Sequence, residues 1–129
     1  MKYFEKGKCS MLADSLVMVF GGGNKTLVRV SPDGNGSLFR FRSATELYTL
    51  RVRHSATKAT ADKPSYERHN VEFIMTTFAA GAVPESYRKV YVVIEQLASD
   101  SNVTVVDALA EWLRNTANAN TIKVIGGEG

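Results

Sequence analysis

Apolar and polar residues alternate with a period of two along much of the chain. Residues 38–42 and 50–53 place arginine at every second position, with apolar side chains between them. Because neighbouring side chains on a β-strand point to opposite faces, this spacing predicts a sheet with one apolar face and one face that carries guanidinium groups.

Turn signals separate the alternating runs. Residues 21–24 (Gly-Gly-Gly-Asn) have the composition of a hairpin turn, and residues 33–36 (Asp-Gly-Asn-Gly) mark a second turn. The predicted strands cover residues 15–20, 25–31, 37–42, 47–55, 66–78 and 87–97. Their short connections favour an antiparallel meander that begins with a hairpin.

Near the end of the chain the apolar period becomes that of a helix. The positions at helical spacing are Val106, Leu109, Ala110 and Leu113, behind the capping candidates Ser99, Ser101 and Asn102. We predict a helix over residues 101–116, followed by a frayed end and, over residues 120–129, a tail. The predicted fold class is α+β: an N-terminal β-hairpin, an antiparallel sheet and a C-terminal helix.

Composition limits the architecture and the compartment. The 129 residues suffice for one domain, 1–129, in which residues 1–14 form an N-terminal extension and residues 15–97 the hairpin and sheet. The single cysteine, Cys9, excludes an internal disulfide and a multi-cysteine metal site, which suits a reducing compartment. No apolar stretch is long enough to span a bilayer, so we expect a soluble protein without a membrane partner.

The predicted apolar face is too wide for one helix to cover. Its members are Tyr48, Leu50, Val52, Val71, Phe73, Met75, Val90, Val92 and Ile94. A helix is about 10–12 Å across, whereas about five strands lie about 4.8 Å apart. We therefore expect a second chain to supply another helix and to pair an edge strand, forming a symmetric homodimer.

The opposite face has the residue types that bind nucleic acid. Its members are Arg40, Arg42, Thr49, Arg51, Arg53, Arg68, Asn70, Glu72, Tyr91, Val93 and Glu95. Arginine can form paired hydrogen bonds to phosphate, and an exposed tyrosine can stack on an unpaired base. Net charge is only +3, so the signal comes from the placement of the arginines, and an ordinary solvated sheet face is the alternative.

The order of segments is informative over residues 15–116. A hairpin comes first, and a later strand ends in Val-Arg-His-Ser at 52–55. After a polar loop come Tyr-Glu-Arg-His-Asn-Val-Glu-Phe at 66–73 and Arg-Lys-Val-Tyr-Val-Val-Ile-Glu at 88–95, which leads into the helix. This order resembles that of the coat proteins of small single-stranded RNA bacteriophages, the levivirus type.

The resemblance implies a viral structural protein. It implies an intertwined dimer in which the helix of each chain packs across its partner's sheet, and an icosahedral T=3 capsid of such dimers. It further implies single-stranded genomic RNA on the inner sheet face, location in the virion, and assembly in the bacterial host cytoplasm.

The resemblance also assigns RNA-binding residues. Tyr91 matches a base-stacking tyrosine, Glu95 a glutamate on the same strand, and Arg53 an RNA-facing arginine. The remaining expected RNA-binding residues, which share this face, are Thr49, Arg51, Arg68 and Asn70. Val93 departs from the Asn or Asp of members that recognise an operator hairpin, so the resemblance implies packaging rather than repression through a specific hairpin.

The loop at residues 79–85 matches a loop that clusters around the shell's symmetry axes in that family. Its small residues suit a segment that adapts to different subunit environments, and the expected assembly residues are Ala79, Gly81 and Pro84. The alternative is an ordinary surface loop.

Other chemical signals are weak. Residues 21–26 lack the glycine-to-lysine spacing of a phosphate-binding loop. His54 and His69 stand on separate predicted strands without a ligand triplet, so we expect no metal site, and Trp112 suits helix packing. We expect neither a cofactor nor catalysis. The alternatives are a dimeric single-stranded nucleic-acid-binding protein that forms no shell, and a small hydrolase that uses His54 or His69.

Overall fold

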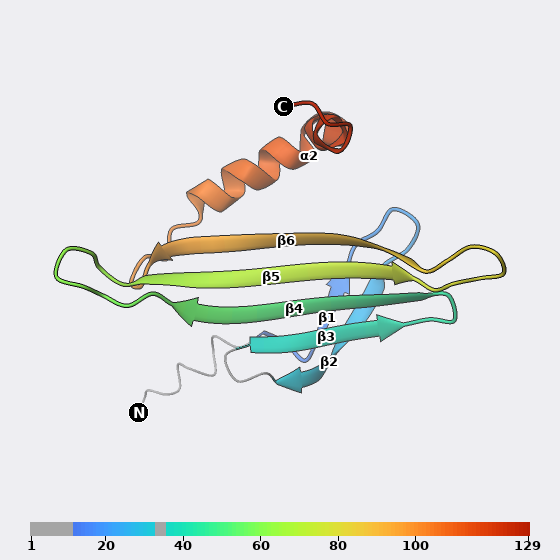
Figure 1. The fold of residues 1–129 in the computed structure, drawn as a ribbon, viewed down its shortest axis with the longest axis horizontal. Helices are drawn as coiled ribbons and strands as arrows, with labels where there is room; N and C mark the ends of the chain where they lie inside the picture. Colours follow the sequence, from blue (N-terminus) through green and yellow to red (C-terminus); the bar gives the residue numbers. More distant parts are fainter. Residues whose placement is uncertain (1–11, 33–35) are drawn as a thin grey trace.

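The computed structural model describes residues 12–32 and 36–129, which form one antiparallel sheet and a C-terminal helix (Figure 1). The strands are β1 (Ser15–Met18), β2 (Lys25–Pro32), β3 (Gly36–Arg42), β4 (Glu46–Ala56), β5 (Tyr66–Thr77) and β6 (Ser86–Leu97). They pair in chain order, each antiparallel to the next. The α+β class and the meander are confirmed. The expectations for Cys9 and for most of the N-terminal extension lie outside the described residues.

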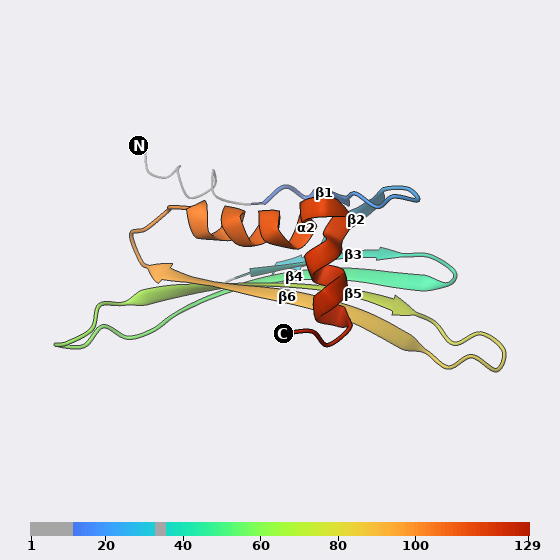
Figure 2. The same cartoon turned by 90° about the horizontal axis from the view of Figure 1, so that it is seen from above.

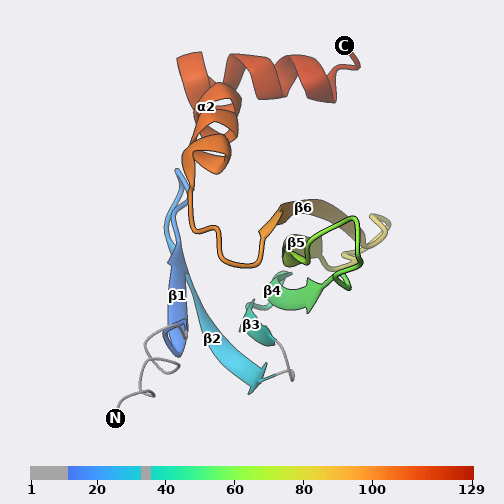
Figure 3. The same ribbon diagram turned by 90° about the vertical axis from the view of Figure 1, so that its left-hand side faces the viewer.

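The sheet is curled, and its apolar face lines the concave side. The β1–β2 hairpin stands at an angle to the other four strands (Figure 3). Register places Tyr48 beside Met75, Leu50 beside Phe73 and Val52 beside Val71, so the predicted apolar face is confirmed. Leu27 from the hairpin and Phe39 from β3 are both 0% exposed. These side chains form the core together with Tyr48 and Leu50, and their burial stabilises the fold by removing apolar surface from water.

Aromatic side chains fix the hairpin against this face. The ring of Phe20 lies 5.4 Å from that of Tyr48, edge to face, and 6.2 Å from that of Phe73. The hairpin therefore covers part of the apolar face of the sheet. We expected the helix to be the only element of the chain that could cover the apolar face. This expectation was wrong, because the sheet curls and brings the hairpin over that face.

Tyr48 is a buried core residue that carries a polar group. Its hydroxyl donates a hydrogen bond to Oε1 of Glu46 at 2.7 Å. Burial raises the pKa of Tyr48, and the hydrogen bond and the negative charge of Glu46 raise it further. The hydroxyl stays protonated well into the alkaline range.

The C-terminal helix, α2 (Thr104–Ile125), is broken in its middle. Residues 115–118 leave the helical conformation, with positive φ at Thr116, Ala117 and Asn118. The side chain of Asn120 donates to the carbonyl oxygen of Trp112 at 2.9 Å, and that of Thr121 donates to the carbonyl oxygen of Leu113 at 2.8 Å. These bonds satisfy two carbonyls that the break leaves without helical partners.

After the break the helix turns sharply and continues to Ile125 (Figure 2). The prediction of a tail over residues 120–129 was therefore wrong for residues 120–125, and the helix begins at Thr104 rather than at residue 101. At that start, Asn102 accepts the backbone N–H of Thr104 at 2.8 Å.

The first part of α2 lies on the same side of the sheet as the hairpin, and the second part runs back past the edge of the sheet at β6 (Figures 2 and 3). Within the described part of the chain, α2 buries none of its residues. Among those residues, α2 also does not combine the length and apolar character that a membrane span requires.

Candidate nucleic-acid interface

The convex face of the sheet collects the predicted RNA-binding residues. Register aligns Arg51 with Glu72 and Tyr91 across β4, β5 and β6. The next row on this face aligns Arg53 with Asn70 and Val93, and the row after it aligns Arg68 with Glu95. Thr49 lies opposite Ile74 on the other side of the Arg51 row. The structure thus brings all seven predicted residues onto one continuous face, and their contact with RNA stays a prediction.

Positive charge is concentrated on this face. Across β3 to β6 its cationic residues are Arg40, Arg42, Arg51, Arg53, Arg68 and Lys89, and its acidic residues are Glu72 and Glu95. Six positive and two negative side chains leave a net +4, whereas the whole chain carries +3. The rest of the molecule is therefore close to neutral, and anions are attracted to this one surface.

Two ion pairs occupy part of the charge. Nε of Arg68 lies 2.9 Å from Oε1 of Glu95, and Nζ of Lys89 lies 3.9 Å from Oε2 of Glu72. Among the described residues, no carboxylate pairs with Arg51 or Arg53. Arg40 on the same face also lacks a carboxylate partner among the described residues, so all three guanidinium groups are available for phosphate.

Exposed aromatic rings lie beside the arginines. Tyr91 is 63% exposed, and Tyr87 is 66% exposed four residues earlier on the same face of β6. The sequence analysis named neither Tyr87 nor Lys89, although counting back in steps of two from Tyr91 gives both positions. Rings with an open face next to cationic groups suit stacking on unpaired bases.

The predicted assembly loop joins β5 to β6 as a tight hairpin at one end of the sheet (Figure 1). Ala80 and Val83 exchange two backbone hydrogen bonds, each 2.9 Å long. Gly81 has φ +58°, a conformation that side chains disfavour in this turn. Ala79, Gly81 and Pro84 all lie in this protruding segment, with Ala79 and Pro84 flanking the bridge, and their role in assembly stays a prediction.

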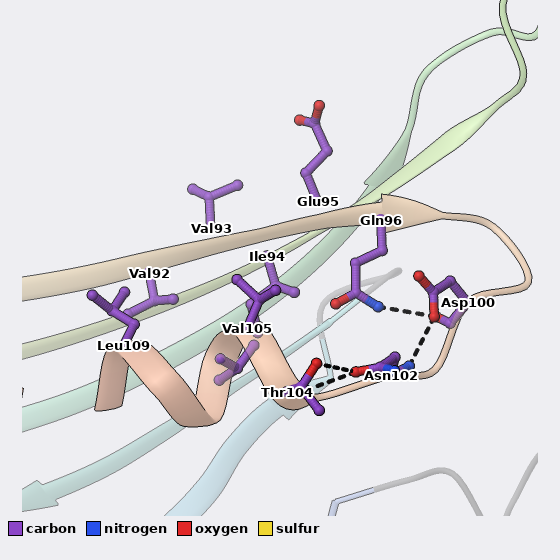
Figure 4. Close-up of a pocket in the computed structure, with 11 residues that line it drawn as sticks. Val92, Val93, Ile94, Glu95, Gln96, Asp100, Asn102, Thr104, Val105 and Leu109 are labelled. Carbon is purple, nitrogen blue, oxygen red and sulfur yellow. Dashed lines mark hydrogen bonds between the residues drawn. The ribbon is translucent and has the colours of Figure 1, made fainter. Parts of the chain in front are cut away.

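A groove of about 600 Å³ opens on the opposite, concave side, between β6 and the start of α2. Val92, Ile94 and Gln96 point from β6 toward Val105 and Leu109 of the helix, while Val93 and Glu95 point away (Figure 4). The apolar face over β6 is open as well, with Val90 65% exposed. Within the described residues, β6 pairs only with β5 and so forms a free edge of 12 residues.

The fold is thus a curled antiparallel sheet with one charged face, followed by a helix that leaves the apolar face over β6 open. The family model described as the coat protein of phage phiCb5 matches residues 13–97, which span the sheet from just before β1 to the end of β6. The chain belongs to this family of phage coat proteins. No curated protein matches the chain.

Membership of this family indicates the kind of protein that carries the charged face. The protein is a viral structural protein, a component of the capsid of the virion. Coat proteins are structural rather than enzymatic, so a hydrolase that uses His54 or His69 is not supported.

Proposed function

We propose that this coat protein is of the levivirus type, that it forms intertwined homodimers, and that these assemble into a T=3 icosahedral shell around single-stranded genomic RNA. The observation that carries the RNA part of the proposal is the net +4 charge on the convex sheet face. Shell assembly takes place in the bacterial host cytoplasm.

The dimer part rests on three unsatisfied surfaces of the single chain. The edge of β6 has backbone donors and acceptors available for another strand. The groove between β6 and α2 and the exposed valines of β6 leave room for an apolar element. The exposed apolar residues of α2, including Leu109 and Trp112, are such an element. A two-fold axis beside β6 satisfies all three surfaces with one operation.

The RNA part assigns roles to the convex face. Arg51 and Arg53 bind phosphates, Tyr91 stacks on a base, and Thr49 and Asn70 donate or accept hydrogen bonds from the same surface. The ion pair with Glu95 holds the guanidinium group of Arg68 in position beside these residues. Position 93 is valine, which offers no hydrogen bond to a base, so packaging of RNA is proposed without repression through one specific hairpin.

The hairpin loop between β5 and β6 projects beyond the sheet, as a segment that meets neighbouring dimers must. We assign Ala79, Gly81 and Pro84 to contacts around the symmetry axes of the shell.

Expression of the chain by itself tests the proposal. Size-exclusion chromatography, electron microscopy and the ratio of absorbance at about 260 and 280 nm are measured on one peak, before and after nuclease treatment. Uniform spheres with nuclease-protected RNA support the shell and its cargo. A dimer-sized peak that binds RNA would favour the alternative of a nucleic-acid-binding dimer without a shell.

The double substitution Arg51→Ala and Arg53→Ala tests the binding face. Both side chains lie on the convex face, so their removal does not change the apolar core. We therefore expect normal thermal stability with less packaged RNA. For single-stranded nucleic acid, losing two phosphate contacts lowers the slope of log affinity against log salt by about 1.4.

The matched control is Lys58→Ala with Lys63→Ala, which removes two positive charges from the exposed loop between β4 and β5. Equal loss of RNA in both double variants would mean that only net charge matters, and would refute the assignment to the convex face.

A further inference from the structure

The chain has two histidines, and the fold places them side by side. His54 on β4 lies directly opposite His69 on β5, near the end of the sheet where β4 finishes and β5 begins (Figure 1). Their Nδ1 atoms are 2.9 Å apart, and their ring centroids are 5.0 Å apart. The pair lies on the concave face, away from the proposed RNA surface, with His54 exposed and His69 partly exposed.

A carboxylate orients one ring of the pair. Oε1 of Glu67 lies 3.4 Å from Nε2 of His69. When Nε2–H of His69 donates to this carboxylate, Nδ1 of His69 carries a free lone pair that faces His54. A carboxylate behind a histidine that offers its other nitrogen is the usual arrangement around histidine ligands of metals. Glu67 is the charged neighbour of the pair on this face, since the cross-strand partners Ile94 and Gln96 on β6 are uncharged.

The chemistry of the two nitrogens selects a class of metal, and their spacing allows them to share one ion. Metal–imidazole bonds are about 2.05 Å, so two nitrogens at 90° around an ion lie about 2.9 Å apart, whereas a tetrahedral angle needs about 3.3 Å. The observed 2.9 Å is the distance of a hydrogen bond between the two rings, so it shows that the nitrogens are close enough to share one ion after a small rotation. Imidazole ligands suit Cu²⁺, Ni²⁺ and Zn²⁺, and Cu²⁺ is bound most strongly among these ions. Ca²⁺ and Mg²⁺ prefer oxygen ligands and do not suit the pair.

We propose that His54 and His69 form a two-histidine binding site for a divalent transition metal, with Cu²⁺ preferred and water completing the coordination. Among residues 12–32 and 36–129, no three side chains of His, Cys, Asp or Glu gather as a ligand set. Water can reach the ion, because His54 is exposed and His69 is partly exposed. His54 binds by moving its proton from Nδ1 to Nε2 through exchange with water. A small rotation of both rings then directs the two lone pairs to one ion, with no net release of protons.

Metal binding at this pair joins β4 to β5 through their side chains. The metal links strands whose connecting loop, residues 57–65, lies beyond the end of the sheet. Bound metal therefore stabilises that end of the hairpin, because the folded arrangement holds both imidazoles together and binds the ion more tightly than the unfolded chain does. This inference does not depend on RNA packaging, since the site lies on the other face.

Electron paramagnetic resonance of Cu²⁺ tests the proposal on the full-length chain without an affinity tag, with Cys9→Ser so that no thiol binds the ion. We expect one Cu²⁺ per chain, with hyperfine splitting from two nitrogens. Because the chain has two histidines, His54→Gln or His69→Gln leaves one imidazole nitrogen and lowers affinity at least about tenfold. A Cu²⁺ signal and affinity unchanged in the double variant would overturn the site.

Glu67 is tested as a positioning residue. Glu67→Ala should weaken Cu²⁺ binding by about 10- to 100-fold while the two-nitrogen signature persists at saturation. Glu67→Gln keeps an acceptor for Nε2–H of His69 and should restore part of the affinity. Equal affinity in all three proteins would refute the role of Glu67. Far-UV circular dichroism verifies that each variant is folded, and excess Ca²⁺ should not displace the bound Cu²⁺.

Discussion

Replacing Leu109 by alanine measures whether α2 packs on a second chain. In the single chain Leu109 is 51% exposed, at the groove between α2 and β6. Full burial of a leucine side chain contributes about 1.5–3 kcal/mol, so the half that the chain itself buries is worth about 1 kcal/mol. If the helix instead packs across a partner's sheet, the substitution also leaves a cavity and costs about 2–5 kcal/mol per chain.

The two ranges can be separated by denaturant unfolding at several protein concentrations, with the oligomeric state measured under the same conditions. Glu111→Ala is the matched control, because Glu111 is exposed on the same helix and its loss should change the free energy of unfolding by less than about 0.5 kcal/mol. We expect Leu109→Ala to lower the unfolding free energy by at least about 2 kcal/mol and to favour dissociation. A cost of about 1 kcal/mol with an unchanged dimer would refute the packing of this helix face against a partner.

The remaining predictions concern the sheet. Phe39→Ala removes a ring that is 0% exposed and should cost about 3–5 kcal/mol in chemical denaturation, and a cost below about 1 kcal/mol would contradict the assigned core. Gly36→Ala places a Cβ against the backbone carbonyl of Val52, so it should separate β3 from β4 and lower the melting temperature, whereas an unchanged temperature would show that this close approach relaxes freely. Tyr48→Phe removes the hydrogen bond to Glu46 and should cost about 1 kcal/mol near neutral pH. Because the folded pKa of Tyr48 lies above the ordinary 10.0, the unfolded chain loses the proton first, so wild-type stability falls as pH rises above about 10, and this part of the fall should vanish in Tyr48→Phe.

The strands and their two faces could be predicted from sequence because side-chain alternation is a local property. Every residue that was assigned to the apolar or to the charged face lies on that face in the structure, since a strand that keeps period two cannot exchange its faces without a shift in register. The seven candidate RNA-binding residues came together for the same reason. The same alternation, continued back along β6 from Tyr91, places Lys89 and Tyr87 on the charged face as well.

The pairing of His54 with His69 could not be read from the chain. Their separation of 15 residues is compatible with many registers, and a shift by one position would place the two rings on opposite faces. Register depends on the whole of β4 and β5, from Glu46 opposite Thr77 to Ala56 opposite Glu67. The sequence analysis therefore dismissed a metal site that the structure brings within reach.

The helix shows the same division between local and tertiary information. Apolar spacing identified its first part, and the run Asn-Thr-Ala-Asn-Ala-Asn at 115–120 was interpreted as the frayed end of the helix, whereas the structure has a break there and further helix beyond it. That the helix resumes to Ile125 depends on Asn120 and Thr121, whose side chains bind carbonyls eight residues earlier.

Sequence alone thus determined the strand order, the α+β class and the two chemically different faces, because alternation and turn composition act over a few residues. Only the tertiary structure decided that the hairpin curls over the apolar face, that two histidines meet, and that α2 leaves a groove beside an open strand. These features depend on register and on the direction in which elements leave the sheet, which long-range packing sets and local pattern does not.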